Sequence, residues 1–192
     1  MFKNTSWIIV SFVLYAIVAL APNSDGATFE MNFVVSNFSG DFGSSAVPND
    51  PVTGSINWEA VGISDPVLSF DSISLTLDGH NYTVGEIGYS RTDFPFTGID
   101  EIGGIINGVG GMASFTDDFW LRWDRNTLMP FDFSYTSSQR YGFWSAYESN
   151  PGSFTSFSIS EVPEPSVVSL FSIILLVFII KTVPESREQY DA

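Results

Sequence analysis

Apolar and polar residues alternate with a period of two through most of residues 28–161. Successive side chains of a β-strand point to opposite faces, so this period predicts half-buried strands. No stretch of ten residues in this region keeps a helical period. The clearest strand is 119–124, where Phe119, Leu121 and Trp123 share one side, and Trp120, Arg122 and Asp124 share the other.

The same pattern predicts about eight to ten strands, spaced as in a β-sandwich. We therefore expect an all-β domain over residues 28–161, a single antiparallel β-sandwich of jelly-roll type. Asp78-Gly79 predicts a tight hairpin turn, and residues 36–51 predict a long loop because they are rich in Ser, Gly, Asn, Asp and Pro. A one-residue slip is expected between Phe70 and Ile73. The side chains expected to face the core include Phe29, Met31, Phe33, Val35, Ile56, Trp58, Ala60, Leu68, Phe70, Ile73, Leu75, Leu77, Tyr82, Val84, Ile87, Met129, Phe131, Phe133, Tyr135, Tyr141, Phe143, Ser145 and Tyr147.

The segment 97–111 is harder to interpret, because it carries six glycines among Ile and Val residues. Glycine weakens strands and helices alike. Two structures fit this composition: a mobile loop, or a strand at a tight crossing. The glycines superficially resemble a phosphate-binding loop, but no Gly-Lys-Ser/Thr sequence accompanies them, which favours a plain loop.

The charge of the region excludes several kinds of partner. Residues 28–161 hold four arginines, no lysine and seventeen acidic residues, for a formal charge of −13. Such a domain is expected to repel nucleic acid and anionic lipid. The chain has no cysteine, which excludes disulfides, thiol catalysis and cysteine-based zinc sites.

The N-terminus predicts a secretory signal peptide over residues 1–27. Lys3 is the only charge before Asp25, an apolar run of fifteen residues follows from Trp7 to Ala21, and small residues come next. Cleavage after Ala21, Gly26 or Ala27 fits this layout, although Pro22 disfavours the first of these. An uncleaved membrane anchor is the alternative.

The C-terminus, residues 162–192, has three parts. Val162, Pro163, Glu164, Pro165 and Ser166 form a short polar motif, residues 167–180 are almost wholly apolar, and Lys181 ends the apolar run. As a helix, these fourteen residues would extend about 21 Å, against about 30 Å of bilayer hydrocarbon. We expect a short membrane helix followed by a tail, 181–192.

This arrangement resembles the PEP-CTERM sorting signal of exported bacterial proteins. The resemblance covers residues 162–181 and implies recognition and cleavage near the motif by an exosortase-type membrane peptidase. The family usually ends in an arginine cluster, whereas this chain has the single Lys181 before a mixed tail. An ordinary C-terminal membrane anchor with a proline-rich hinge is the alternative.

Catalytic chemistry has little support in the sequence. His80 follows the Asp78-Gly79 turn and is expected to be a solvated turn residue, since no Gly-x-Ser-x-Gly motif accompanies it. Asp117 and Asp118 could supply half of the carboxylate pair of a small glycoside hydrolase. Adjacent strand residues point to opposite faces, however, which disfavours a shared site.

Two kinds of binding are better supported. Calcium could be held by oxygens of the acidic loops at Asn49-Asp50, Asp78–Asn81 and Asp117-Asp118, although none has the spacing of a known calcium loop. A glycan could stack on exposed indoles. Trp120 and Trp144 are the candidates, because each lies off the face assigned to the core; core packing is the alternative for both.

Taken with the resemblance, these features predict an exported protein of the cell surface or extracellular matrix. Its expected role is structural or adhesive and associated with exopolysaccharide, an association that the resemblance to PEP-CTERM proteins implies. We expect no enzymatic activity. A lectin-like carbohydrate-binding module is the first alternative and a small glycoside hydrolase the second.

Overall fold

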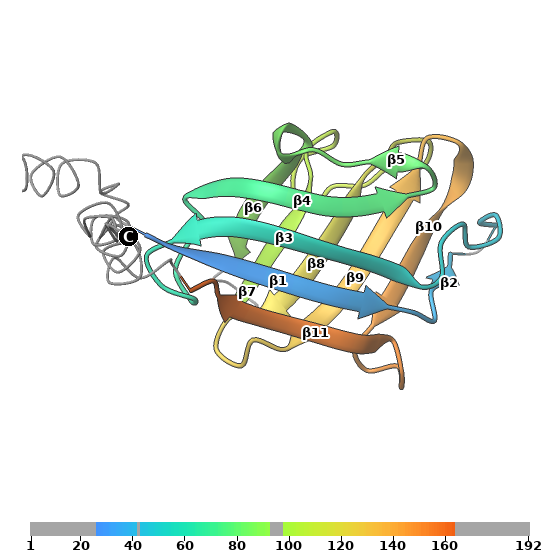
Figure 1. The fold of residues 1–192 in the computed structure, drawn as a ribbon. Coiled ribbons are helices and arrows are strands. Elements are labelled where there is room, and N and C mark those ends of the chain that lie inside the picture. Colours follow the sequence, from blue (N-terminus) through green and yellow to red (C-terminus); the bar gives the residue numbers. More distant parts are fainter. Residues whose placement is uncertain (1–25, 42, 93–97, 164–192) are drawn as a thin grey trace, which may run out of the picture.

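A computed structural model describes residues 26–41, 43–92 and 98–163, which form two antiparallel β-sheets packed face to face (Figure 1). The first sheet has the order β11-β1-β3-β4-β5 and the second has the order β2-β10-β9-β8-β7-β6. We call them the five-stranded and the six-stranded sheet. The strands are β1 (Ala27–Val35), β2 (Ser39–Gly40), β3 (Val52–Ala60), β4 (Ser69–Leu77), β5 (His80–Asn81), β6 (Ile87–Thr92), β7 (Ile99–Gly104), β8 (Phe119–Asp124), β9 (Pro130–Ser137), β10 (Arg140–Tyr147) and β11 (Phe154–Glu161).

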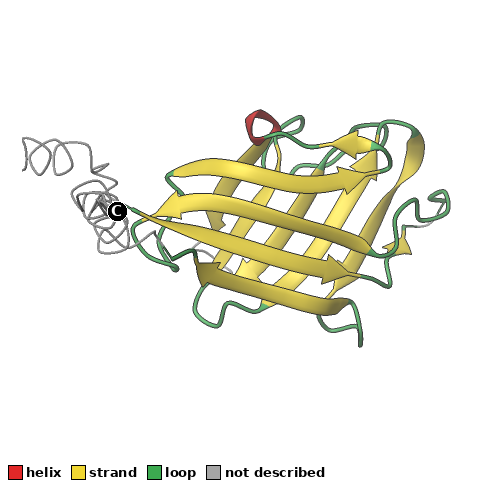
Figure 2. Ribbon diagram, viewed as in Figure 1, coloured by secondary structure: helices red, strands yellow, loops and turns green. Residues whose placement is uncertain are grey.

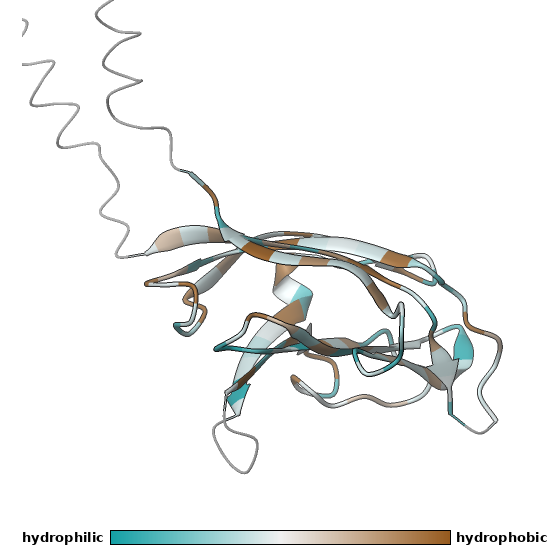
Figure 3. Ribbon diagram, turned by 90° about the horizontal axis from the view of Figure 1, so that it is seen from below, coloured by the Kyte–Doolittle hydropathy of each residue, from teal (hydrophilic) through white to brown (hydrophobic). Residues whose placement is uncertain are grey.

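The two sheets enclose one apolar core, and Figure 3 shows them edge-on as two layers. Both layers contribute large side chains that are almost fully buried. Aromatic rings connect them across the interface: Phe33 of β1 lies 5.6 Å from Phe133 of β9, and Trp58 of β3 lies 6.4 Å from Trp123 of β8. The interior of a disulfide-free domain is therefore built largely from aromatic packing.

The expected all-β fold is confirmed, as are several predicted strand faces. The alternate residues of β1, β3 and β8 that were assigned to the core are buried. Asp78 and Gly79 make the predicted tight turn, both with positive φ (46° and 88°), as a two-residue hairpin requires. The slip in β4 is also present, since Asn57 pairs with Ser72 while Trp58 pairs with Phe70.

The structure corrects three details of the predicted strands. Val84 belongs to a 3-10 turn, η1 (Val84–Glu86), and is 42% exposed; the turn is the only helical element among the described residues (Figure 2). Thr83 and Glu86 cap it reciprocally. Residues 36–51 are not wholly a loop, because β2 pairs there with β10. Leu68, expected to face the core, precedes β4 and is 58% exposed.

The glycine-rich segment divides into a strand and a loop. Residues 99–104 form β7 between β6 and β8. A side chain at Gly104 would collide with the Asp118 carboxylate, and one at Gly103 would approach the Phe119 carbonyl oxygen. Glycine is needed at these two positions for close approach of the chain, so the tight-crossing interpretation holds for 103–104. Residues 105–118 form the loop that follows.

Both ends of the described chain lie at the same end of the sandwich. The β1–β11 ladder is antiparallel and pairs Phe29 with Glu161. It extends one step further, where the Val162 amide donates to the Thr28 carbonyl oxygen at 2.8 Å. The domain therefore begins and ends on neighbouring strands.

The predicted signal peptide (1–27) lies outside the described residues except for its last two positions. The motif residues Glu164, Pro165 and Ser166, the apolar run 167–180 and the tail with Lys181 lie outside them too. Among residues 26–41, 43–92 and 98–163, no helix has the length and hydropathy needed to cross a membrane.

Candidate binding surface

The outward side of the six-stranded sheet is the candidate site. Strand register places its side chains in two rows that cross the sheet. One row runs through small residues on both sides of Trp120: Gly88, Gly103, Trp120, Ser134, Ser145 and Ser39. The other row is polar and ends in an aromatic ring: Ser90, Glu101, Arg122, Asp132 and Tyr147.

Trp120 lies on this outward side, as its position in β8 predicts. Its side chain is half-buried and meets the Phe143 ring of β10 edge-on, with ring centroids 5.9 Å apart. Ser134 and Ser145 follow Trp120 in the same row and hydrogen-bond to one another at 2.8 Å. Both serines are almost fully buried although they face outward, because the neighbouring aromatic side chains exclude water from them.

An ion pair forms the centre of the second row. Arg122 donates from Nε to one Asp132 oxygen at 2.7 Å and from its terminal nitrogen to the other oxygen. Asp132 is fully buried. These bonds raise the pKa of Arg122, so the guanidinium keeps its positive charge. The guanidinium also lies over two rings, 4.7 Å from the Trp120 centroid and 5.3 Å from that of Phe131.

Glu101 of β7 lies beside Arg122 in the same row. Loop 105–118 covers it, and a side chain at Gly110 would collide with its carboxylate. The pKa of Glu101 is raised, mainly because burial disfavours the charged form; the charge of Arg122 opposes this shift and that of Asp132 adds to it. The row therefore holds one cation between two acids.

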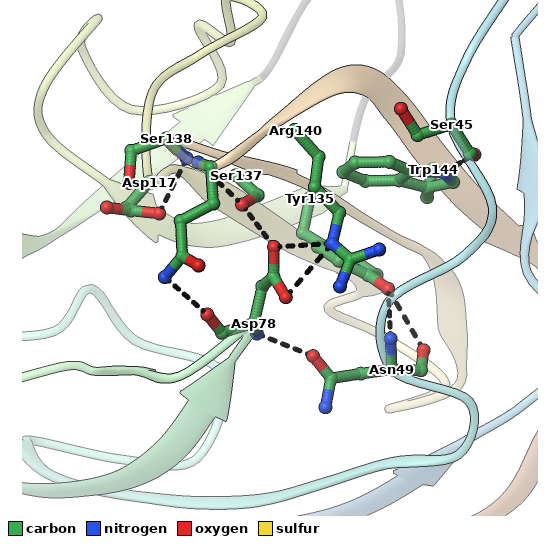
Figure 4. A network of polar contacts seen from close by, with 10 residues as sticks. Ser45, Asn49, Asp78, Asp117, Tyr135, Ser137, Ser138, Arg140 and Trp144 are labelled. Atoms are coloured by element: carbon green, nitrogen blue, oxygen red, sulfur yellow. Dashed lines mark hydrogen bonds and ion pairs between the residues drawn. The ribbon is translucent and has the colours of Figure 1, made fainter.

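Of the two alternatives for Trp144, core packing holds and an exposed indole does not. Its side chain is fully buried, its indole nitrogen donates to the Ser45 carbonyl oxygen at 3.0 Å, and its ring packs 5.3 Å from Tyr135 (Figure 4). The inward residues of β10 are Trp144 and Ala146, opposite to the predicted face. An irregular register between Arg140 and Trp144 causes this inversion.

Three aromatic residues in or beside β9 and β10 that the prediction placed in the core, Phe131, Tyr141 and Tyr147, are in fact exposed, as is Met129. Tyr141 and Tyr147 are 53% and 41% exposed, and Met129 and Phe131 are 55% and 49% exposed. Phe131 is the extra residue of a β-bulge, because Arg122 pairs with Asp132 while Trp123 pairs with Pro130. Phe115 of loop 105–118, 59% exposed, packs 5.7 Å from Tyr141. The sequence carries no signal for the bulge at Phe131 or for the irregular register of β10, so the exposure of Phe131, Tyr141 and Tyr147 could not be predicted.

The acidic loops proposed for calcium are held together by donors of the protein itself (Figure 4). Asp78 accepts from Arg140 at 3.0 Å and from Ser137 at 2.5 Å, while its amide donates to the Asn49 side chain. The Asp50 carboxylate accepts from two backbone amides, those of Asn37 and Phe38. In the part of the chain that the structure describes, no group of three His, Cys, Asp or Glu side chains is placed to hold a metal ion.

Asp117 and Asp118 do not form a carboxylate pair. Asp117 accepts from the Ser138 amide at 2.8 Å, whereas Asp118 is fully buried and accepts from the amides of Asn107 and Phe119, both at 3.1 Å. Burial raises the pKa of Asp118, and these hydrogen bonds partly oppose that rise. The two carboxylates are each committed to a different loop, so the geometry of a glycoside hydrolase is not assembled there.

His80 is less solvated than a turn residue was expected to be. Its side chain is 29% exposed and lies between two acids, with Nε2 3.2 Å from Glu86 and Nδ1 3.8 Å from Asp117. Its ring meets Tyr82 edge-on at 4.6 Å. It therefore connects hairpin β4–β5 to η1 and to the end of loop 105–118.

A groove of about 580 Å³ lies beside strand β11. Its lining includes Met129, Glu148, Phe154 and Phe157. Glu148 is the only ionisable side chain that lines it, so it offers no convergent catalytic groups.

No protein-family model, no curated protein and no solved structure matches this chain.

Proposed function

We propose that this chain is an exported protein of the cell surface or extracellular matrix, sorted through its PEP-CTERM-like C-terminus and structural or adhesive in role. The observation that carries the proposal is the pairing of β1 with β11. It brings residue 27, which follows the expected signal peptide, close to residue 162, where the sorting motif begins. A domain with both ends at one pole can be held at a membrane by either end, while its opposite pole faces away from it.

The position of the motif supports processing without unfolding. The last ladder bond of the domain is made by Val162, and Pro163 has no amide hydrogen to extend it. Cleavage by an exosortase-type peptidase near residues 163–166 would leave all eleven strands intact. The apolar segment 167–180 would hold the chain in the membrane until then.

The domain itself suits an extracellular location. Its high negative charge favours solubility, and the absence of cysteine makes it independent of redox conditions. We also propose jelly-roll-like connectivity. Its support is that β11 returns to lie beside β1 in the five-stranded sheet, as the last strand of a Greek key does, while β6 to β10 follow one another as a meander in the other sheet.

A carbohydrate-binding module on the same scaffold is a second candidate function. The gathering of aromatic side chains on the outward side of β8, β9 and β10 favours it over a purely structural role. A glycoside hydrolase has less support than a binding module, because the carboxylates of Asp117 and Asp118 do not converge on one site.

Intact mass of the protein from membrane and medium fractions tests the export proposal. We expect a product that begins between residues 22 and 28 and ends near residues 163–166, recovered outside the cell or with added mass at its new end. The matched control replaces Pro163, Glu164 and Pro165 with alanine, which should leave the chain uncleaved in the membrane. A wild-type product that stays in the membrane and still ends at Ala192 would contradict the proposal.

A further inference from the structure

Aromatic rings gather on one side of the molecule. We define the aromatic surface as the exposed Phe131, Tyr141 and Tyr147 and the half-buried Trp120 and Phe143, with the exposed Phe115 beside it. Single exposed apolar residues are ordinary on protein surfaces, but a contiguous group usually marks an interaction site. The outward side of the five-stranded sheet has no aromatic side chain at its register positions in β1, β3, β4 and β11.

Polar groups are built into this surface between the rings. The Arg122–Asp132 pair lies between Trp120 and Phe131, and Tyr147 is directly opposite Asp132 in the register. The guanidinium is held by two bonds to one carboxylate, so its remaining N–H donors have a fixed direction. The surface thus alternates apolar rings with oriented hydrogen-bonding groups.

We propose that the aromatic surface binds a neutral polysaccharide chain. The inference rests on the proposed extracellular role and names the ligand that this role would use. A sugar ring presents an apolar C–H face that stacks on an aromatic ring and a rim of hydroxyls that hydrogen-bond. Both kinds of contact are available at this surface.

Charge and desolvation disfavour the other occupants. An acidic polymer would approach a domain with a formal charge of −13, in which the one arginine of this surface is already paired. A second copy would bring the same negative charge. An apolar protein face would cover the remaining Arg122 donors without replacing their bonds to water, which is costly.

The length of the surface favours a chain over a single sugar. Tyr141 and Tyr147 lie at opposite ends of β10, at most about 20 Å apart along the strand. Rings at both ends and in the middle would contact several successive sugar units.

The test measures binding of the full-length chain, purified in detergent, by affinity electrophoresis and calorimetry. The probes are dextran, hydroxyethyl cellulose, galactomannan, the neutral polysaccharide fraction of the producing organism's own matrix, and alginate as the acidic comparison. We expect binding to at least one neutral probe and weaker or no binding to alginate.

Two matched variants distinguish binding at the aromatic surface from non-specific binding. Replacing Tyr141 and Tyr147 together with alanine should lower the association constant about ten-fold or more, because two stacking contacts are lost. Leu68→Ala removes a side chain of similar exposure (58%) next to β4 and should leave the constant within about two-fold.

Three results would overturn the inference: no binding to any neutral probe, tighter binding to alginate, or equal binding by the double tyrosine variant. If that variant instead changes the sedimentation of the protein without any polysaccharide, the surface serves self-association. Correct processing without polysaccharide binding would remove this inference alone. An unprocessed chain ending at Ala192 would remove the export proposal and leave the binding result unaffected.

Discussion

The outward sides of the two sheets differ sharply, although the same alternation produces both. On the five-stranded sheet the outward positions are small and polar, apart from Val34: Thr28, Glu30, Asn32, Thr53, Ser55, Asn57, Glu59, Ser72, Ser74, Thr76, Ser156, Ser158 and Ser160. On the six-stranded sheet they carry Trp120, Phe143, Tyr147 and an ion pair between the part-exposed Arg122 and the buried Asp132.

The difference shows which part of the sequence the fold constrains. A sandwich requires apolar residues only at inward positions, and both sheets supply them. A hydrated outward side needs nothing more than small polar residues. Burying the Asp132 charge lowers the free energy of unfolding unless the charge is paired, and exposed tyrosine rings lower solubility. Folding alone requires neither feature, so these residues are better explained by binding.

The largest expected effect tests the inward direction of Trp144 beneath the aromatic surface. Trp144→Ala should lower the free energy of unfolding by about 3–5 kcal/mol, because the side chain is fully buried and its bond to Ser45 is lost. Urea denaturation measures this. Phe143→Ala, the outward neighbour, should cost less than half as much; equal losses would mean that the direction of β10 is wrong.

A second variant separates the two outward sides by their charges. Arg122→Ala should lower the free energy of unfolding by about 3 kcal/mol, because it leaves the Asp132 carboxylate buried without its cation. Glu59→Ala on the five-stranded sheet removes an exposed bond to Ser69 and should change stability by less than about 0.5 kcal/mol. Similar values for both would contradict the contrast between the two sides.

Two buried tyrosine hydroxyls, one near each sheet, differ in the same way in their hydrogen bonding. Tyr82, which follows β5, is buried, and among the described residues its hydroxyl has no hydrogen-bond partner; burial raises its pKa well above the ordinary value. Tyr82→Phe should therefore raise the free energy of unfolding by up to about 1 kcal/mol. Tyr135 of β9 donates to the Asn49 carbonyl oxygen at 2.9 Å, so Tyr135→Phe should lower it by about 1 kcal/mol. Changes of the same sign in the free energy of unfolding would contradict the assignment of one hydroxyl as unpaired and the other as hydrogen-bonded.

The smallest effect depends on pH. Because the pKa of Glu101 is raised in the folded state, its contribution is favourable below the unfolded-state pKa and is lost as pH rises through the folded pKa. Glu101→Gln should therefore increase stability near pH 7 and have little effect below about pH 4. Thermal melts at both pH values measure the difference, and a gain confined to acid pH would contradict the stated burial of this carboxylate.

Local signals were sufficient for some elements and not for others. Strands β1, β3 and β8 could be predicted because their alternation is unbroken, and Asp78-Gly79 because both residues tolerate positive φ. The inward residues Phe133 and Tyr135 of β9 were also predicted, but the positions of Phe131 and of the β10 side chains could not be. The extra residue at Phe131 and the irregular register before Trp144 interrupt the alternation, and pairing with a neighbouring strand determines where such irregularities occur. The outward position of Trp120 in β8 could therefore be predicted, whereas the face of β10 that carries Trp144 could not.

The pairing of β11 with β1 has a mechanical consequence. Strand β11 is at the edge of its sheet and runs toward the end of the domain from which residue 163 leaves. A load applied through that residue would pull along the strand, so the ladder bonds to β1 would share it in shear and would not peel apart one after another. A domain held by its C-terminus while its aromatic surface grips a moving polymer would place its strain on this one ladder.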